Sequence, residues 1–231
     1  MKLLPFFCSL YLATLVDAKT GEIRIDEEKQ YEQYQDIKRA LENEDKRSWL
    51  YYRSYSRQTD GVEHTCVYAL VNGKKEGGNA YNFEQGYTIP NGKGKREVKH
   101  QLLATTYKTP NLEGREKDNA MNVTKTEGDP GGQHYLLIYS DYQKCDILRL
   151  LSAPHSSECE LYLHDSAVNG GVPKPCESMY GNACGKDHSS YRRQVYNESC
   201  KGPEPPKEET TPITEETETD TTTTSTVAPG C

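Results

Sequence analysis

The chain has 231 residues, with 28 basic and 35 acidic side chains and a formal net charge of −7. Residues 203–231 hold one Lys against seven acids, so residues 19–202 carry a net charge of only −1. Because no basic stripe is present to meet phosphates, the composition excludes nucleic acid as a partner. No later segment approaches the roughly 20 apolar residues of a membrane helix, so no membrane association is expected.

Both ends of the chain differ in composition from the middle. Residues 1–18 predict an export signal, because Lys2 precedes the apolar run "LLPFFCSLYLATLV" and Ala18 ends the segment with a small residue. Residues 203–231 hold ten Thr and five Pro and predict a disordered, O-glycosylated tail. Residues 19–202 are long enough for one domain with a single core. The protein is therefore expected to be secreted and extracellular.

The first predicted element is a short amphipathic helix. The acids at residues 26–28 are typical of a helix start. An apolar stripe with helical spacing follows them, made of Tyr31, Tyr34, Ile37 and Leu41. This stripe predicts one continuous helix that packs one face against the rest of the domain.

Eight runs of strand character follow, separated by loop signals such as "NGKKEGGN", "PNGKGK" and "EGDPGGQ". The runs are residues 48–56, 64–71, 79–89, 96–107, 119–127, 133–140, 144–151 and 159–165. Short strands with tight connections favour an antiparallel meander, and eight of them can close into an up-and-down barrel that holds one small ligand. A two-sheet sandwich is the structural alternative. Residues 172–185 predict a short C-terminal helix.

The cysteines predict a disulfide framework. Cys8 lies in the predicted export signal, and Cys231 is the odd one among the seven that remain. A helix that follows a closed barrel can pack only on its outside, so bonds from the last two strands to that helix need outward-pointing cysteines. We therefore propose three pairs, each stabilising by roughly 3–4 kcal/mol. They are Cys145–Cys176, Cys159–Cys184 and Cys66–Cys200.

Two of these strands place an acid directly after the cysteine, in the doublets Cys145–Asp146 and Cys159–Glu160. Since side chains alternate between the faces of a strand, an outward cysteine turns the next residue inward. Asp146 and Glu160 are therefore predicted to enter the barrel from neighbouring strands, with Tyr162 on the same inner face. Buried carboxylates need a compensating cation or become protonated.

The source of that cation is open at the level of the residues. Arg53 is one candidate, because alternation predicts that its face also carries Trp49, Tyr51 and Tyr55. Both doublets can instead lie at frayed strand ends, with the acids in water. The third possibility is a small cationic ligand, which an aromatic wall stabilises by about 0.5–2 kcal/mol.

These residues resemble the histamine-binding branch of the tick salivary lipocalins. The most specific match is "CDI", a spacer, "ELY" and then Cys176, and it includes the acids of both doublets. "HTCVYALV" and "NESC" fit the first and last half-cystines of the family, and "YQD" fits its N-terminal helix. The resemblance runs from about residue 27 to residue 201.

The resemblance implies a mainly β, lipocalin-like, eight-stranded antiparallel up-and-down barrel, with a short N-terminal helix and a C-terminal helix packed outside. It implies a protein of tick saliva that sequesters histamine or serotonin and so suppresses host inflammatory defence. One amine site is expected, because Ile37 replaces the Trp that usually follows the helix Asp. The candidate ligand-binding residues are Asp146, Glu160, Tyr162, Tyr55, Asp36 and Trp49.

Other functions lead to different expectations. Asp146 and Glu160 have the residue types of a general acid–base pair, but the predicted disulfides argue against an enzyme, and no nucleophile or metal-ligand spacing is present. We therefore expect no catalysis, no cofactor and no metal. The alternatives are a lipocalin that inhibits a host complement or clotting factor, or a scavenger of a lipid mediator such as a leukotriene. We expect a monomer, with N-linked glycans at Asn122 and Asn197.

Overall fold

The computed structural model describes residues 25–92, 94–110, 114–127, 129, 131–151, 158–185 and 191–201. The predicted export signal, the predicted tail and Cys231 lie outside the described residues. Within these ranges, no helix combines the length and the apolar character that crossing a bilayer requires.

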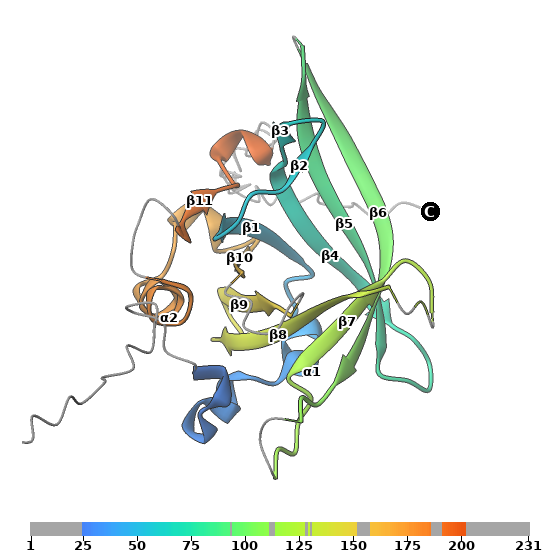
Figure 1. Cartoon of the computed structure of the whole chain (residues 1–231), viewed down its shortest axis with the longest axis vertical. Coiled ribbons are helices and arrows are strands. Elements are labelled where there is room, and N and C mark those ends of the chain that lie inside the picture. Colours follow the sequence, from blue (N-terminus) through green and yellow to red (C-terminus); the bar gives the residue numbers. More distant parts are fainter. Residues whose placement is uncertain are drawn as a thin grey trace, which may run out of the picture. The chain divides into compact units, whose positions relative to one another are not determined.

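Eight antiparallel strands form a closed barrel (Figure 1). They are β1 (Arg47–Arg53), β4 (Thr65–Lys74), β5 (Ala80–Asn91), β6 (Gly94–Tyr107), β7 (Ala120–Thr124), β8 (Gln133–Ser140), β9 (Cys145–Leu150) and β10 (Cys159–His164). Each strand pairs with the next, and β10 returns to pair with β1. The predicted eight-stranded barrel is confirmed, and closure of the sheet on itself excludes the two-sheet sandwich.

Short elements surround the barrel. They are η1 (Ile25–Glu27), η2 (Lys29–Tyr34), α1 (Ile37–Leu41), β2 (Gln58–Thr59), β3 (Val62–Glu63), η3 (Val168–Gly170), α2 (Lys174–Cys184), β11 (Arg193–Gln194) and η4 (Glu198–Cys200). Helix α1 lies at one end of the barrel and the β2–β3 hairpin lies at the other, while α2 packs outside against β8 and β9 (Figure 1). We call these two ends the α1 end and the hairpin end.

The turn of the β2–β3 hairpin follows directly from its sequence. Asp60 and Gly61 have φ angles of 52° and 76°, and both values lie in the left-handed region that Asp, Asn and Gly tolerate best. Two successive residues with positive φ make the tight turn that suits the twist of a short hairpin. The hairpin therefore returns the chain to the barrel at Thr65.

The N-terminal segment is not the single helix that its apolar stripe predicts. The segment breaks at Gln35, which is fully buried and donates Nε2 hydrogen bonds to the Ile25 and Ile138 carbonyl oxygens at 3.0 and 3.1 Å. Tyr34, before the break, packs on the outside of the barrel against Tyr139. Ile37, after the break, packs inside the barrel. Because the stripe divides between two cores, one straight helix cannot serve both.

The apolar residues form two cores that share the barrel wall. The inner core fills the barrel and includes Leu50, Leu148 and Tyr162. The outer core lies between the wall and α2 and includes Ile147 and Leu161. Residues of β9 and β10 therefore alternate between the cores as the doublets predict. This alternation fixes which side chains reach the interior.

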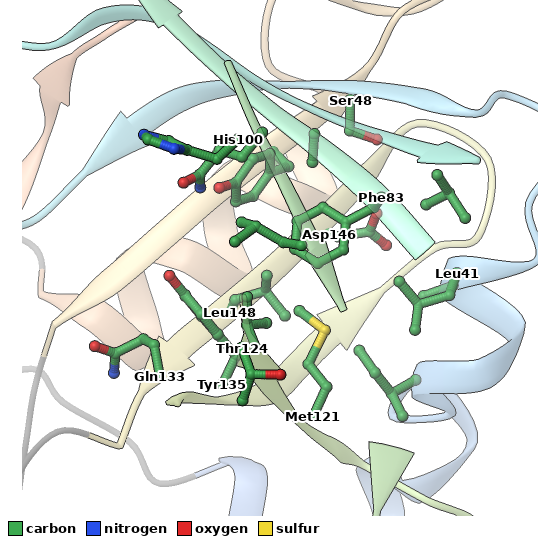
Figure 2. A pocket seen from close by; sticks show the side chains of 18 of the residues that line it. Leu41, Ser48, Phe83, His100, Met121, Thr124, Gln133, Tyr135, Asp146 and Leu148 are labelled. Carbon is green, nitrogen blue, oxygen red and sulfur yellow. The ribbon is translucent and has the colours of Figure 1, made fainter. Parts of the chain in front are cut away.

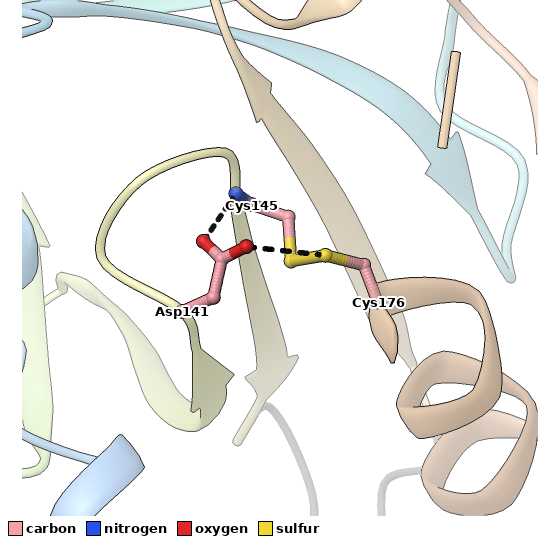
Figure 3. A group of neighbouring side chains, drawn as sticks. All are labelled: Asp141, Cys145 and Cys176. Carbon is pink, nitrogen blue, oxygen red and sulfur yellow. Dashed lines mark hydrogen bonds between the residues drawn. A yellow bond between two sulfur atoms is a disulfide. The ribbon is translucent and has the colours of Figure 1, made fainter. Parts of the chain in front are cut away.

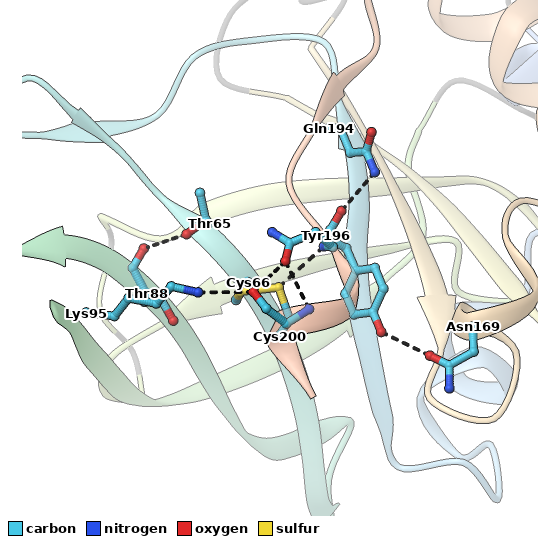
Figure 4. The surroundings of a disulfide bond; sticks show 10 residues. Thr65, Cys66, Thr88, Lys95, Asn169, Gln194, Tyr196 and Cys200 are labelled. Atoms are coloured by element: carbon cyan, nitrogen blue, oxygen red, sulfur yellow. Dashed lines mark hydrogen bonds between the residues drawn. A yellow bond between two sulfur atoms is a disulfide. The ribbon is translucent and has the colours of Figure 1, made fainter. Parts of the chain in front are cut away.

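Three disulfides fasten the outer layer to the barrel. Cys145–Cys176 and Cys159–Cys184 join β9 and β10 to α2, and Cys66–Cys200 joins β4 to η4. These are the three pairs proposed from the sequence. Figure 4 shows Cys66–Cys200 with Tyr196 beside it, and the Tyr196 hydroxyl donates to Asn169 Oδ1 at 3.1 Å. The bond holds the C-terminal segment against the barrel.

Candidate ligand-binding cavity

The barrel encloses a cavity of about 600 Å³ that extends from the α1 end toward the hairpin end. This volume lies within the range of roughly 300–1,000 Å³ that is typical of small-molecule sites. Figure 2 shows the side chains that project into the cavity. Its middle is apolar and is lined by Phe83, Leu102, Met121, Val123, Leu137 and Leu148. Polar groups lie toward the two ends.

Asp146 enters the cavity from β9, toward the α1 end (Figure 2). Its side chain is 14% exposed, and Oδ2 lies 2.9 Å from His164 Nε2. Oδ1 is buried, and no hydrogen-bond partner reaches it from the described residues. The carboxylate therefore keeps acceptor capacity that none of the described residues uses, in surroundings where an unsatisfied polar group is costly.

His164 approaches Asp146 from the inner face of β10, and its side chain is 1% exposed. Burial disfavours the charged imidazolium and lowers its pKa, but the hydrogen bond to Asp146 and the Asp146 charge act in the opposite direction. The net effect raises the pKa of His164 above its ordinary value. The side chain hydrogen-bonded to Asp146 is therefore a histidine, whose charge depends on pH.

Glu160 lies further toward the hairpin end and is 2% exposed. The Tyr55 hydroxyl donates to Oε1, and the Tyr162 hydroxyl donates to Oε2 at 3.1 Å. Burial raises the pKa of Glu160, while the Tyr55 hydrogen bond and the nearby Arg57 charge oppose that rise. Arg57, on the loop between β1 and β2, lines the cavity, and its charge acts on this carboxylate. The protein therefore supplies Glu160 with two donors and a cation of its own.

Arg53 is not the direct partner of either internal acid. It is 2% exposed, and its Nη2 donates to Glu63 Oε2 in β3 and to the His64 carbonyl oxygen. Burial raises the pKa of Glu63, but hydrogen bonds from Ser56 and Gln58 and the Arg53 charge outweigh it and lower that pKa to about 2. Arg53 therefore fastens the hairpin to the barrel. Of the candidate sources of positive charge, it contributes to Glu160 through its charge, without a direct hydrogen bond among the described residues.

Trp49 does not lie on the cavity side of β1. The pairing of β1 with β10 shifts register between Leu50 and Tyr52, which marks a β-bulge. Before the bulge, Trp49 points into the outer core, where Nε1 donates to Asp165 Oδ1. After the bulge, Arg53 points inward. The prediction that Trp49 and Tyr51 share a face with Arg53 and Tyr55 is therefore wrong, because the bulge inverts the alternation.

Asp36 lies at the start of α1, outside the cavity lining. Its Oδ1 accepts a hydrogen bond from the Arg39 backbone N–H at 3.2 Å, which caps the helix, and its Oδ2 lies 3.0 Å from Lys117 Nζ. The structure therefore gives Asp36 the role of a helix cap, which differs from the expected ligand contact.

The two predicted glycosylation residues differ in their surroundings. Asn197 is exposed, and its Oδ1 accepts hydrogen bonds from the Ser199 N–H and hydroxyl at 3.1 and 2.6 Å. Asn122 lies on β7, and its Oδ1 is buried. A Cβ placed on Gly132 would lie 2.0 Å from that atom, so the neighbouring chain covers it closely. Asn197 is the more accessible acceptor.

Two interior residues, His164 and Arg57, are not among the candidate ligand-binding residues that the sequence predicts. His164 follows Glu160 by four residues, so the same alternation that turns Glu160 inward also turns His164 inward. That signal was present in "CELYLHD". Arg57 lies in a connecting segment without periodicity, and nothing in its neighbourhood predicts that it folds back into the barrel.

Asp141, Cys145 and Cys176 form a cluster whose residue types can bind metals (Figure 3). The two sulfur atoms are joined to each other, so neither is a thiolate. Asp141 Oδ1 accepts hydrogen bonds from the backbone N–H groups of Gln143, Lys144 and Cys145 at 2.7–3.0 Å. The cluster therefore shapes the turn between β8 and β9.

A closed eight-stranded antiparallel barrel around a cavity, with a helix packed outside, defines a small-ligand-binding protein of the lipocalin type. The family model described as tick histamine binding protein matches residues 25–202, and the chain belongs to that family. The family and the three disulfides are consistent with secretion.

Solved structures of other lipocalins are similar to this chain at low identity. Japanin from Rhipicephalus appendiculatus, solved with bound cholesterol, is 14% identical with a TM-score of 0.43, and the match covers 61% of this chain and 87% of japanin. Apocrustacyanin C2 is 12% identical with a TM-score of 0.48, and the match covers 76% and 88% of the two chains. Lobster apocrustacyanin A1 is 11% identical with a TM-score of 0.40, covering 65% and 77%. No curated protein sequence matches the chain.

Proposed function

We propose that this protein is a secreted scavenger of a small biogenic amine, histamine or serotonin, which it holds in the barrel toward the α1 end. The Asp146 carboxylate is the observation that carries the proposal. It lines the cavity and has one hydrogen-bonding side chain among the described residues, His164. An ammonium group supplies both the charge and the donors that such a carboxylate lacks.

The rest of the cavity suits the remainder of an aromatic amine. Phe83 and Tyr162 line the cavity together with Asp146. An aromatic ring buries apolar area against these side chains, and their faces attract the cationic end of the ligand. Glu160 already accepts two tyrosine hydroxyl groups, so it holds the interior together and does not take up the ligand. Removal of the amine from host tissue would suppress an inflammatory response.

Isothermal titration calorimetry of the full secreted chain with histamine and with serotonin tests the proposal. The wild type is expected to bind at least one of them, and Asp146→Asn is expected to weaken binding by about 10- to 100-fold, because a hydrogen bond to a charged group contributes roughly 1.5–3 kcal/mol. Asp60→Asn is the matched control. It removes the same charge from an exposed turn whose positive φ Asn tolerates, and its affinity is expected to stay within about twofold.

Two results contradict the proposal: no heat from either amine with the wild type, or equal affinity of Asp146→Asn and the wild type. Organic extraction of the purified protein followed by mass spectrometry then distinguishes the alternatives. A co-purified lipid supports a lipid-mediator scavenger, and an empty barrel supports a lipocalin that binds a host protein through its outer loops.

A further inference from the structure

His164 is the buried histidine that lies against the proposed amine site. It is paired in register with Ser48 of β1, and its own backbone N–H donates to the Lys144 carbonyl oxygen at 2.9 Å. Its backbone is therefore held by neighbouring segments on both sides. Within the described residues, it is the one side chain hydrogen-bonded to the Asp146 carboxylate.

The charged and titratable groups around His164 come from three neighbouring segments. Asp146 on β9 is in direct contact, and Asp45 before β1 adds a second negative charge. Tyr142 in the turn between β8 and β9 lies near Asp146, and Lys46 lines the same end of the cavity. The negative charges nearest His164 favour its protonated form, and burial opposes that form.

We infer that His164 is a positioning residue for the amine site: its Nε2–H holds Asp146 Oδ2 and fixes the rotation of the carboxylate that receives the ligand ammonium. Because a carboxylate only accepts hydrogen bonds, Nε2 must carry the proton in this contact. This inference rests on the proposed function, since it assigns a role within the same site. In this role, His164 determines which lone pairs of the Asp146 carboxylate face the ligand.

The same contact couples ligand binding to protons. A protonated His164 and a ligand ammonium compete for one carboxylate, so a bound ligand lowers the proton affinity of His164. Binding then releases a proton wherever His164 is charged in the free protein. The pKa of His164 is raised above its ordinary value, so the affinity is expected to be lowest in acid. It rises through and above about pH 6.5 and becomes constant once free His164 is neutral.

Calorimetry with serotonin over the range from about pH 5.5 to about pH 8.5 tests this coupling. The serotonin ammonium, like that of Lys with a pKa of about 10.4, stays charged throughout. Wild-type affinity is expected to be about tenfold weaker at the acidic limit, which corresponds to a shift of about one pKa unit in His164 on binding. Titrations in two buffers with different ionisation enthalpies count the released proton.

Two substitutions separate position from charge. His164→Gln keeps an N–H donor near the place of Nε2 but cannot become charged, so it is expected to bind within about threefold of the wild type at high pH and to lose the pH dependence. His164→Leu removes the donor and is expected to bind about tenfold more weakly at every pH. His134→Gln, at a histidine of β8 outside the cavity lining that contacts the Tyr107 hydroxyl, is the matched control and is expected to keep the wild-type profile.

An NMR titration of the imidazole signals in ligand-free protein provides a readout that needs no ligand. The contact predicts a higher pKa for His164 in the wild type than in Asp146→Asn. If serotonin binds but the profile is flat, or His164→Gln keeps the wild-type profile, the inference is wrong while the proposed function stands. If neither amine binds and His164 titrates as predicted, the proposed function is wrong, and the ligand role of His164 falls with it.

Discussion

Asp146 and Glu160 each follow a half-cystine on neighbouring strands, and both point into the barrel. In the ladder Asp146 is paired with Tyr162 and Glu160 with Leu148, so the two acids are one two-residue step apart, about 7 Å along the strands. Their surroundings nevertheless differ. Toward the hairpin end Glu160 accepts two tyrosine hydroxyls beside an arginine. Toward the α1 end, Asp146 has a single side-chain partner, a histidine, among the residues that the structure describes.

This difference separates a structural carboxylate from one available to a ligand. A buried acid whose two oxygens both accept hydrogen bonds strengthens the fold, since each partner would be left unsatisfied without it. A buried acid with unused acceptor capacity is a cost that a ligand can remove on binding. The same sequence doublet therefore gives a structural acid in one case and an acid available to a ligand in the other. The segment that follows β1 makes the difference, because it places Tyr55 and Arg57 near Glu160.

The largest expected effect comes from removing each acid in turn and measuring stability. Glu160→Leu is expected to lower the free energy of unfolding by about 3–5 kcal/mol, because it strands two tyrosine hydroxyls and a cation in the barrel. Asp146→Leu is expected to cost about 1–2 kcal/mol, because one partner is lost. Denaturant unfolding with the disulfides intact measures both. Equal costs would show that the two acids do not differ in structural role.

A smaller effect is expected from Tyr55→Phe, which removes one hydroxyl donor from Glu160. The loss of a hydrogen bond to a charged acceptor is expected to cost about 1.5–3 kcal/mol of unfolding free energy. Tyr51→Phe is the matched control on the same strand, because Tyr51 packs in the outer core, and its cost is expected to stay within about 0.5 kcal/mol. If both substitutions cost the same, the hydroxyl of Tyr55 does not stabilise Glu160.

The hairpin end and the α1 end were also unequally predictable from the sequence. The inward phase of Asp146 and Glu160 follows from alternation plus the need for outward cysteines, and both signals are local. The same rule, continued for four residues beyond Glu160, reaches His164. Arg57 follows from no periodic pattern, since its place in the barrel depends on how the loop between β1 and β2 closes.

Where sequence reasoning failed, tertiary packing overrode a local pattern. On β1, Tyr51 and Tyr52 both pack outside, with ring centroids 4.9 Å apart, and accommodating both side chains there requires the bulge. In the N-terminal segment, Gln35 bonds two carbonyl oxygens of different elements and breaks the helix. Neither a bulge nor such a bond leaves a signature in alternation or in helical spacing.

The smallest expected effect tests whether Trp49 lies in the outer core. Trp49→Phe removes the hydrogen bond to Asp165 and is expected to cost about 1 kcal/mol of unfolding free energy. Because the ring lies in the outer core, amine affinity is expected to stay within about twofold. Phe83→Leu truncates an aromatic side chain that lines the cavity and is expected to weaken binding by about three- to tenfold. Calorimetry with the amine on both variants measures these two changes in affinity. A large loss of affinity in Trp49→Phe would mean that the ligand contacts the outer face of β1, and the division of the wall into a binding face and a structural face would be wrong.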